Sequence, residues 1–232
     1  MRRNNEDTAY ASPRLAAVAD GVGGAAAGEV ASRVVIGALA GLEKSWVDGS
    51  LDEALARAVA DGNDRIAFFM ECRPETAGMG TTLTAVALHG DYVVANIGDS
   101  RTYLLRDGDL RRLTRDDSLV QRLVDSGAVT PADARTHPQR SLVLEALDGD
   151  PDRRPPAVTA IPARAGDRLL LCSDGLSDAL DDERIADLLG VASREECAEG
   201  LVAAALAAGA RDNVSVVVAD VAPRRDPAAG WR

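Results

Sequence analysis

The stretch Leu15-Ala16-Ala17-Val18-Ala19-Asp20-Gly21-Val22-Gly23-Gly24 determines how the rest of the chain is interpreted. Five apolar residues run without interruption into Asp20, and glycines follow at once. This pattern predicts a buried strand that ends on a carboxylate at the edge of a sheet and continues into a loop of small residues. The pattern returns at residues 169–175, where an apolar run leads to Ser173, Asp174 and Gly175.

Two further carboxylates lie beside predicted strands. Asp99 follows the apolar segment 92–97, and Asp212 precedes the segment 214–221. Strand-end aspartates that are far apart in sequence can meet at one sheet edge, and they repel one another unless a cation lies between them. The sequence therefore predicts a divalent metal centre with oxygen ligands.

The composition limits the classes of protein to which the chain can belong. With 232 residues it forms one large domain or two small ones, and its net charge of −11 disfavours nucleic acid and anionic membranes as partners. No apolar run approaches the roughly 20 residues of a membrane span, and the N-terminal residues lack the apolar core of a signal peptide. Three cysteines are an odd number without paired spacing, which favours reduced thiols and a cytoplasmic location.

The periodicity of apolar residues predicts an α+β fold in which helices cover antiparallel sheets. Capping-box patterns at Ser50 with Glu53 and at Ser118 with Gln121 predict two helix starts, and Asp107-Gly108 predicts a hairpin turn. We expect residues 1–222 to form a single domain and residues 223–232 to form a flexible tail. The surface segment 125–139 is expected to be mobile. The expected strands are 15–19, 83–88, 92–97, 102–105, 110–113, 158–161, 168–172 and 214–221, and the expected helices begin near 28, 50, 118, 131, 182 and 193.

A series of motifs is spread along nearly the whole chain. In order they are Arg2-Arg3-Asn4-Asn5-Glu6-Asp7, Asp20-Gly21-Val22-Gly23-Gly24 with Gly28-Glu29, Gly80-Thr81-Thr82, Gly98-Asp99-Ser100-Arg101, His137-Pro138 through Leu147, Ser173-Asp174-Gly175-Leu176 with Asp178, and Asp212-Asn213. In these motifs the chain resembles the bacterial branch of the type 2C protein phosphatases, the metal-dependent PPM family. Residues 118–147 are particularly similar to the actinobacterial Ser/Thr phosphatases that oppose receptor-like kinases. The resemblance implies a four-layer α-β-β-α sandwich with the metals at one sheet edge.

The resemblance also implies a centre of two Mn²⁺ or Mg²⁺ ions. Asp20 would bridge both ions, and Gly21 would offer a backbone carbonyl to one of them. Asp174 and Asp212 would hold the other ion. Hydrolysis of phosphoserine and phosphothreonine would proceed by attack of a metal-bound hydroxide, without a covalent phosphoenzyme.

Residues around this centre would complete the site. Glu6 and Asp7 would act largely through bound waters, and Asp99 with Asp178 would form a third, weaker metal site. Arg2 matches the arginine with which the family grips phosphate, so Arg2 and Asp20 are the expected catalytic residues. Only Met1 precedes Arg2, where relatives carry a strand.

The expected partners are phosphorylated proteins, including Ser/Thr kinases and their targets, and the expected state is a monomer. Two alternatives stay open from the sequence. One is a non-catalytic phosphatase-like module that binds phosphoproteins or a kinase, which the short N-terminus favours. The other is a relative that acts on anti-sigma-factor antagonists. A cysteine-based phosphatase needs an arginine six residues after its cysteine. Asp178 occupies that position after Cys172, so this class of phosphatase is disfavoured.

Overall fold

The computed structural model describes residues 4–22, 27–45, 50–191 and 193–222. Its main sheets are both antiparallel. The first has five strands in the order β1 (Thr8–Ala11), β2 (Leu15–Ala19), β5 (Leu83–His89), β6 (Asp91–Ile97) and β9 (Ala157–Ile161). The second has four strands in the order β11 (Val216–Asp220), β10 (Arg168–Cys172), β7 (Arg101–Arg106) and β8 (Asp109–Arg112). Helices and antiparallel sheets together confirm the predicted α+β class.

Strand β2 explains why the opening stretch is apolar at every position. Its side chains alternate between two cores: Ala17 and Ala19 belong to the core under the first helical pair, whereas Ala16 and Val18 belong to the core between the sheets. All five residues of the strand are buried. A strand that is covered on both faces has no solvent side, so it reads as a continuous apolar run.

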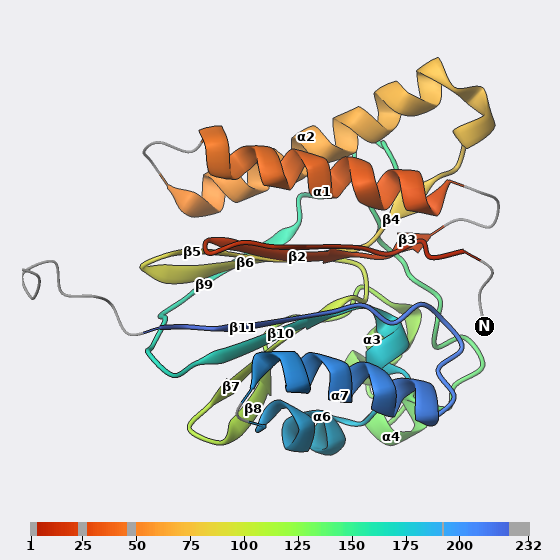
Figure 1. Cartoon of the computed structure of the whole chain (residues 1–232). Helices are drawn as coiled ribbons and strands as arrows, with labels where there is room; N and C mark the ends of the chain where they lie inside the picture. Colours follow the sequence, from red (N-terminus) through yellow and green to blue (C-terminus); the bar gives the residue numbers. More distant parts are fainter. Residues whose placement is uncertain (1–3, 23–26, 46–49, 192, 223–232) are drawn as a thin grey trace, which may run out of the picture.

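Two pairs of helices cover the outer faces of the sheets (Figure 1). Helices α1 (Gly28–Ser45) and α2 (Leu51–Cys72) lie on the five-stranded sheet and bury Leu39, Leu55 and Ile66 against it. Helices α6 (Asp182–Leu189) and α7 (Arg194–Ala207) lie on the four-stranded sheet, where Ile185 and Leu201 are fully buried. The described helices include none that is both long and apolar enough to cross a membrane.

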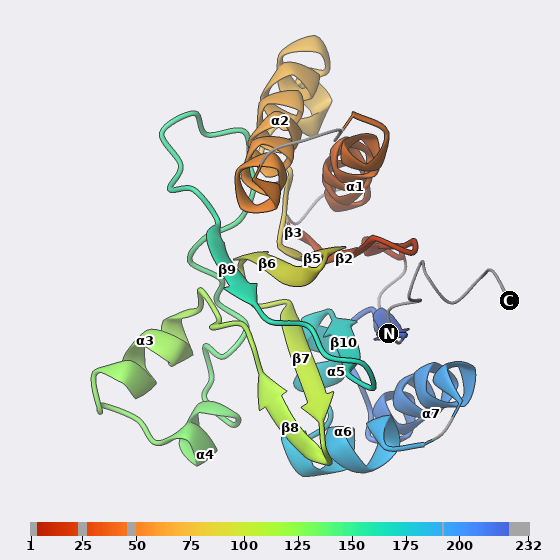
Figure 2. The same ribbon diagram turned by 90° about the vertical axis from the view of Figure 1, so that its left-hand side faces the viewer.

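Two short helices, α3 (Leu119–Asp125) and α4 (Pro131–Ala134), stand at one side of the molecule, apart from both helical pairs (Figure 2). We call residues 118–144 the α3–α4 lobe. Neither helix contains a buried residue. The lobe is closed at its base by backbone hydrogen bonds from Leu119 to the carbonyl of Leu142, at 2.9 Å, and from Leu144 to the carbonyl of Asp117, at 2.8 Å. The predicted mobility of residues 125–139 stays a prediction.

Of the two predicted helix caps, the one at Ser118 is confirmed and the one at Ser50 is not. Ser118 caps α3 as predicted, because its Oγ accepts a hydrogen bond from the amide of Gln121. The predicted capping box at Ser50 is wrong: the side chain of Ser50 makes no capping hydrogen bond. The first turn of α2 carries Asp52 and Glu53 instead, and their charge favours a helix N-terminus.

The hairpin turn is confirmed, since Asp107 and Gly108 have φ angles of 54° and 84°. Four short elements escaped prediction because two to four residues carry no periodicity. They are β3 (Gly21–Val22), β4 (Gly80–Thr81), the 3-10 turn η1 (Pro74–Thr76) and α5 (Asp174–Ser177).

Candidate metal centre

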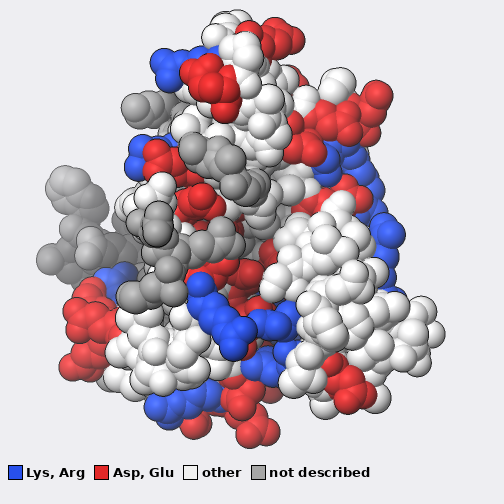
Figure 3. Space-filling model, turned by 90° about the vertical axis from the view of Figure 1, so that its right-hand side faces the viewer, with Lys and Arg blue, Asp and Glu red and all other residues white. Residues whose placement is uncertain are grey.

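The predicted carboxylates lie where strands begin or end. Asp20 joins β2 to β3, and Asp174 opens α5 directly after β10 and Ser173. Asp7 precedes β1, and Asp99 lies between β6 and β7. In Figure 3 acidic side chains gather in a hollow of the face shown, next to a group of basic side chains.

The electrostatics of these carboxylates show that they share one poorly solvated region. Burial, together with the negative charges of Asp7, Asp174 and Asp99, raises the pKa of Asp20 well above its usual range. Burial and the charges of Asp178 and Asp212 raise the pKa of Asp174 to about 6. Such upward shifts are expected where like charges are held together without a cation between them.

The same effect extends to two more members of the group. The pKa of Asp99 is raised to about 8 by burial and by the charges of Asp174 and Asp116. Burial also raises the pKa of Asp7, and hydrogen bonds from neighbouring side chains offset only part of that effect. Asp7, Asp20, Asp99, Asp174 and Asp212 are therefore brought together as one electrostatically coupled group, which we call the carboxylate group.

Unsatisfied oxygen atoms provide a separate test of whether a cation suits this group. Within the described ranges, the buried oxygens Oδ1 of Asp7 and Oδ1 of Asp174 accept no hydrogen bond. Buried polar atoms without a partner are rare in folded proteins and call for an ion or a water. No three His, Cys, Asp or Glu side chains of the described chain are placed to hold a metal by themselves. This does not argue against a metal site, because Mg²⁺ and Mn²⁺ usually retain water and so need fewer side chains as ligands. The crowded carboxylates and their unsatisfied oxygens therefore favour a cation.

Two glycines allow the loops of the carboxylate group to approach one another. A Cβ on Gly21 would lie 2.3 Å from the carbonyl carbon of Gly28, and a Cβ on Gly175 would lie 2.0 Å from the carbonyl oxygen of Asn213. Both distances are far below any real contact, so only glycine fits at these positions. The Asp-Gly pairs that the sequence repeats are therefore required by backbone packing and do more than form turns.

A second set of polar residues holds the carboxylates in place. Thr82 Oγ1 accepts a hydrogen bond from the amide of Asp20, at 3.2 Å, and lies 2.7 Å from Ser100 Oγ. Ser173 Oγ donates to Asp7 Oδ2 at 2.8 Å. Thr82, Ser100 and Ser173 are all almost fully buried. All three residues stand inside the sequence motifs, but no role was predicted for them. Their position next to the motif carboxylates is the signal that could have identified them.

The other predicted site residues lie at the margin of the group. The backbone of Glu6 connects both ends of the chain, since its amide donates to Asn213 Oδ1 at 3.0 Å and its carbonyl accepts from the amide of Gly21 at 3.2 Å. Asp178 is exposed at the end of α5. Arg2 lies outside the described residues.

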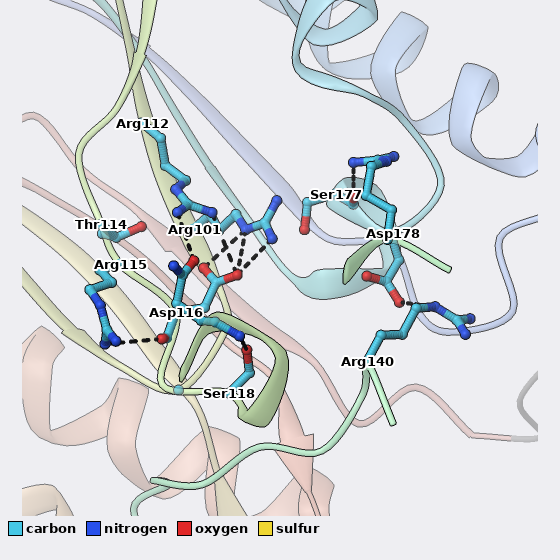
Figure 4. Close-up of polar contacts among 12 residues, drawn as sticks. Arg101, Arg112, Thr114, Arg115, Asp116, Ser118, Arg140, Ser177 and Asp178 are labelled. Carbon is cyan, nitrogen blue, oxygen red and sulfur yellow. Dashed lines mark hydrogen bonds and ion pairs between the residues drawn. The ribbon is translucent and has the colours of Figure 1, made fainter. Parts of the chain in front are cut away.

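Asp178 faces the α3–α4 lobe. Its Oδ2 lies 3.3 Å from Nε of Arg140, a residue of the lobe (Figure 4). A turn of helix separates Asp178 from Asp174, and the amide of Asp178 donates to the carbonyl of Asp174 at 2.7 Å.

A buried ion pair lies at the root of the lobe. The guanidinium of Arg101 binds both carboxylate oxygens of Asp116, with the shortest distance at 2.6 Å, and Arg112 approaches the same carboxylate at 3.6 Å (Figure 4). The Asp116 side chain is 5% exposed. Sequence reasoning missed this pair, because nothing in a local pattern links β7 to the segment after β8.

Comparison with known proteins places this arrangement in a family. The family model described as protein phosphatase 2C matches residues 5–208. The chain belongs to the protein phosphatase 2C family. Membership in this family of metal-dependent Ser/Thr protein phosphatases confirms the resemblance read from the motifs.

Individual relatives support the same assignment. The chain is 53% identical over 222 residues to the serine/threonine protein phosphatase PstP of Mycobacterium tuberculosis, an alignment that covers 95% of this chain and 43% of PstP. It therefore spans less than half the length of that relative. It is 33% identical over 234 residues to the serine/threonine phosphatase stp of Listeria welshimeri, covering 95% of this chain and 91% of that protein.

A solved structure of a protein phosphatase 2C relative contains metal. The catalytic domain of PstP in complex with two manganese ions superposes with a TM-score of 0.89 at 50% identity, covering 96% of this chain and 94% of that one. Two manganese ions in so similar a fold agree with the number of ions that the resemblance implied.

Proposed function

We propose that this chain hydrolyses phosphoserine and phosphothreonine on proteins, with two Mn²⁺ or Mg²⁺ ions as cofactors, and so reverses Ser/Thr kinase signalling. The observation that carries the proposal is the carboxylate group, whose pKa values are raised by mutual repulsion and which contains buried oxygens without a partner. A site built of carboxylates alone repels a phosphate. It becomes a phosphate site only when cations offset its charge.

The donor set supports the following assignment of ligands. Asp20 would lie between the two ions, Gly21 would present its carbonyl to one, and Asp174 with Asp212 would hold the other. When bound, a pair of divalent ions activates water as a nucleophile and offsets the charge of the phosphoryl group. The remaining assignments are Glu6 and Asp7 through water, and Asp99 with Asp178 for a third ion.

The protein's own contribution is to fix these carboxylates before substrate arrives. Thr82 and Ser100 hold the backbone before Asp20, and Ser173 fixes one oxygen of Asp7 so that its other oxygen stays available. Preorganised charges cost no rearrangement during the reaction, which is the main source of electrostatic catalysis. We assign the grip on the phosphate to Arg2, whose planar guanidinium suits two phosphate oxygens.

Several broader features belong to the same proposal. We infer a single catalytic domain, arranged as a four-layer α-β-β-α sandwich, that acts as a monomer in the cytoplasm on phosphorylated proteins. The layered arrangement is supported by the order of the helical pairs and sheets in Figure 1 and by the three apolar cores between them.

Phosphate release from a phosphothreonine peptide tests the proposal. We expect release with Mn²⁺ or Mg²⁺, none with EDTA, and a loss of more than about 100-fold in Asp20→Asn and Asp174→Asn, because removing even an outer partner of a metal ligand typically costs 10–100-fold. Asp152→Asn, an exposed loop carboxylate, is the matched control and should retain the full rate. A folded protein that binds the peptide but releases no phosphate with either metal would make the chain a binding module.

A further inference from the structure

A cavity of about 500 Å³ extends from the carboxylate group to the α3–α4 lobe. Its lining includes the acids Asp99, Asp174 and Asp178 as well as the apolar side chains of Val120 and Val124 of α3. Both valines are only half-buried. A volume of this size, with both apolar and polar side chains in its lining, suits a peptide segment better than a phosphate group alone.

The acidic residues of the cavity that lie outside the carboxylate group already have partners. Asp116 is bound by Arg101 and Arg112. Asp181 accepts a hydrogen bond from the amide of Arg184 at 2.8 Å, and Asp182 accepts one from the hydroxyl of Tyr103 at 3.2 Å. Asp178 is paired with Arg140. Their negative charge is therefore partly offset within the protein.

Arg135 is the exception among the arginines that line the cavity. Its guanidinium forms no ion pair with any carboxylate in the described parts of the chain. Among the described residues, the one hydrogen bond of its guanidinium runs from Nη1 to the carbonyl oxygen of Ser177, at 3.5 Å, which is at the outer limit of a hydrogen bond. The residue is exposed, so a competing anion can reach it.

The position of Arg135 relates it directly to the carboxylate group. Ser177 is the last residue of α5, and Asp174 is the first. Arg135 and Asp174 also line the same cavity, so one extended segment bound in the cavity can reach both of them.

We infer that Arg135 recognises a second anionic group, close in sequence to the phosphorylated residue that is hydrolysed, in the bound protein segment. This inference rests on the proposed function. Guanidinium groups bind phosphates and carboxylates through two parallel hydrogen bonds, and a group without an internal partner loses little when it does so. The favoured substrates are therefore segments that carry two phosphates, or a phosphate next to an acidic residue.

Matched peptides test the inference. Four phosphothreonine peptides differ only two residues after the phosphothreonine, where they carry alanine, asparagine, aspartate or a second phosphothreonine. We expect kcat/KM for release of the first phosphate to be about 5–10-fold higher with the second phosphate than with alanine, as for a partly exposed charge-assisted contact, with aspartate between them. The gain should appear chiefly in KM, because the contact is made before the reaction begins.

Variants locate the effect. Arg135→Ala should reduce the preference to nearly 1, and Arg135→Lys should keep part of it. Arg122→Ala is the matched control: Arg122 is an exposed arginine of α3 that does not line the cavity, so it should leave the preference and the hydrolysis of p-nitrophenyl phosphate unchanged. An unchanged preference in Arg135→Ala, or no preference in the wild-type protein, would overturn the inference.

A binding measurement separates this inference from the proposed function. The same peptides are made with non-hydrolysable phosphonates and titrated by fluorescence anisotropy in Mn²⁺. If p-nitrophenyl phosphate and all peptides resist hydrolysis while the doubly anionic peptide still binds more tightly through Arg135, the proposed function fails and the recognition stands. If all four peptides bind with equal affinity and are still hydrolysed, the recognition by Arg135 fails and the proposed function stands.

Discussion

Strand β10 has an aspartate near each end, and the two carboxylates are in opposite situations. Asp167 precedes the strand and is fully satisfied: Arg106 binds both of its oxygens at 2.6 Å, and the hydroxyl of Tyr92 donates to it at 2.7 Å. Asp174 follows the strand, lies among other carboxylates and keeps one oxygen without a donor in the described chain.

The contrast also appears in their protonation. Burial alone would raise the pKa of Asp167, but the hydrogen bonds from Arg106 and Tyr92 outweigh burial and lower it. At Asp174, burial and the charges of Asp178 and Asp212 outweigh the lowering effect of a contact with Asp20, and the pKa is raised to about 6. A carboxylate that serves the fold has its partners within the protein, whereas one that serves a ligand is left without them. This difference separates Asp167, an acid that stabilises the fold, from Asp174, the acid that the proposed function assigns to a metal, at the two ends of one strand.

The largest expected effect comes from removing the partner of the satisfied acid. Arg106→Met leaves Asp167, whose side chain is 1% exposed, as a buried charge without its cation. We expect a loss of about 3–5 kcal/mol in the free energy of unfolding, which urea denaturation measures. The control is Arg57→Met, which removes an exposed pair on α2 and should cost less than about 1 kcal/mol. Equal losses would mean that the pair near Asp167 contributes no more than a surface pair.

A smaller effect of opposite sign is expected at the other end of the strand. Because the pKa of Asp174 is raised in the folded chain, its ionised form destabilises the metal-free protein at neutral pH. The penalty begins to fall as the pH drops through about 6 and is lost below the ordinary pKa of 3.8. In EDTA at pH 7, Asp174→Asn should therefore raise the free energy of unfolding by about 1–2 kcal/mol.

The pH dependence checks the sign of that prediction. In EDTA the wild-type protein should gain stability relative to Asp174→Asn between about pH 7 and pH 5, and in Mn²⁺ the wild-type protein should be the more stable of the two. A variant that is less stable than the wild type in EDTA at neutral pH would show that Asp174 is a structural acid like Asp167.

The smallest effect on stability is expected from the pair between Asp178 and Arg140. Asp178 lies beyond the same end of β10 as Asp174 but has an arginine partner. Its pair with Arg140 leaves both side chains about one-third exposed, at 33% and 37%. Arg140→Ala should change the free energy of unfolding by less than about 1 kcal/mol, because exposed pairs contribute little. Amide hydrogen exchange in residues 131–140 should nevertheless become faster, since the pair connects the lobe to α5; an unchanged exchange rate would show that this connection does not hold the lobe.

Much of the fold could be predicted because its signals are local. The apolar runs at residues 15–19 and 168–172 identify strands buried on both faces, and the aspartates after them identify the sheet edge. The positions of Asp20, Asp99, Asp174 and Asp212 beside strands were therefore predicted from the sequence without knowledge of the fold. Among the acids, the family resemblance added Glu6, Asp7 and Asp178.

The partners of these residues could not be found in that way. The hydrogen bond from Ser173 to Asp7 joins residues 166 positions apart, and the bond from Arg106 to Asp167 joins residues 61 apart. No periodicity records such a pairing. Whether an aspartate is satisfied or left without a donor depends on these distant contacts, so the sequence could not distinguish Asp167 from Asp174 on physical grounds.

The bond from the Glu6 amide to Asn213 Oδ1, which spans 207 positions, has a consequence for synthesis. During translation, Asp212 and Asn213 emerge about 200 residues after Glu6 and Asp7. A nascent chain therefore carries acidic loops through that interval without the residues that complete their site. Contacts so distant in sequence form slowly, so we expect this domain to acquire its metal in a late step of folding.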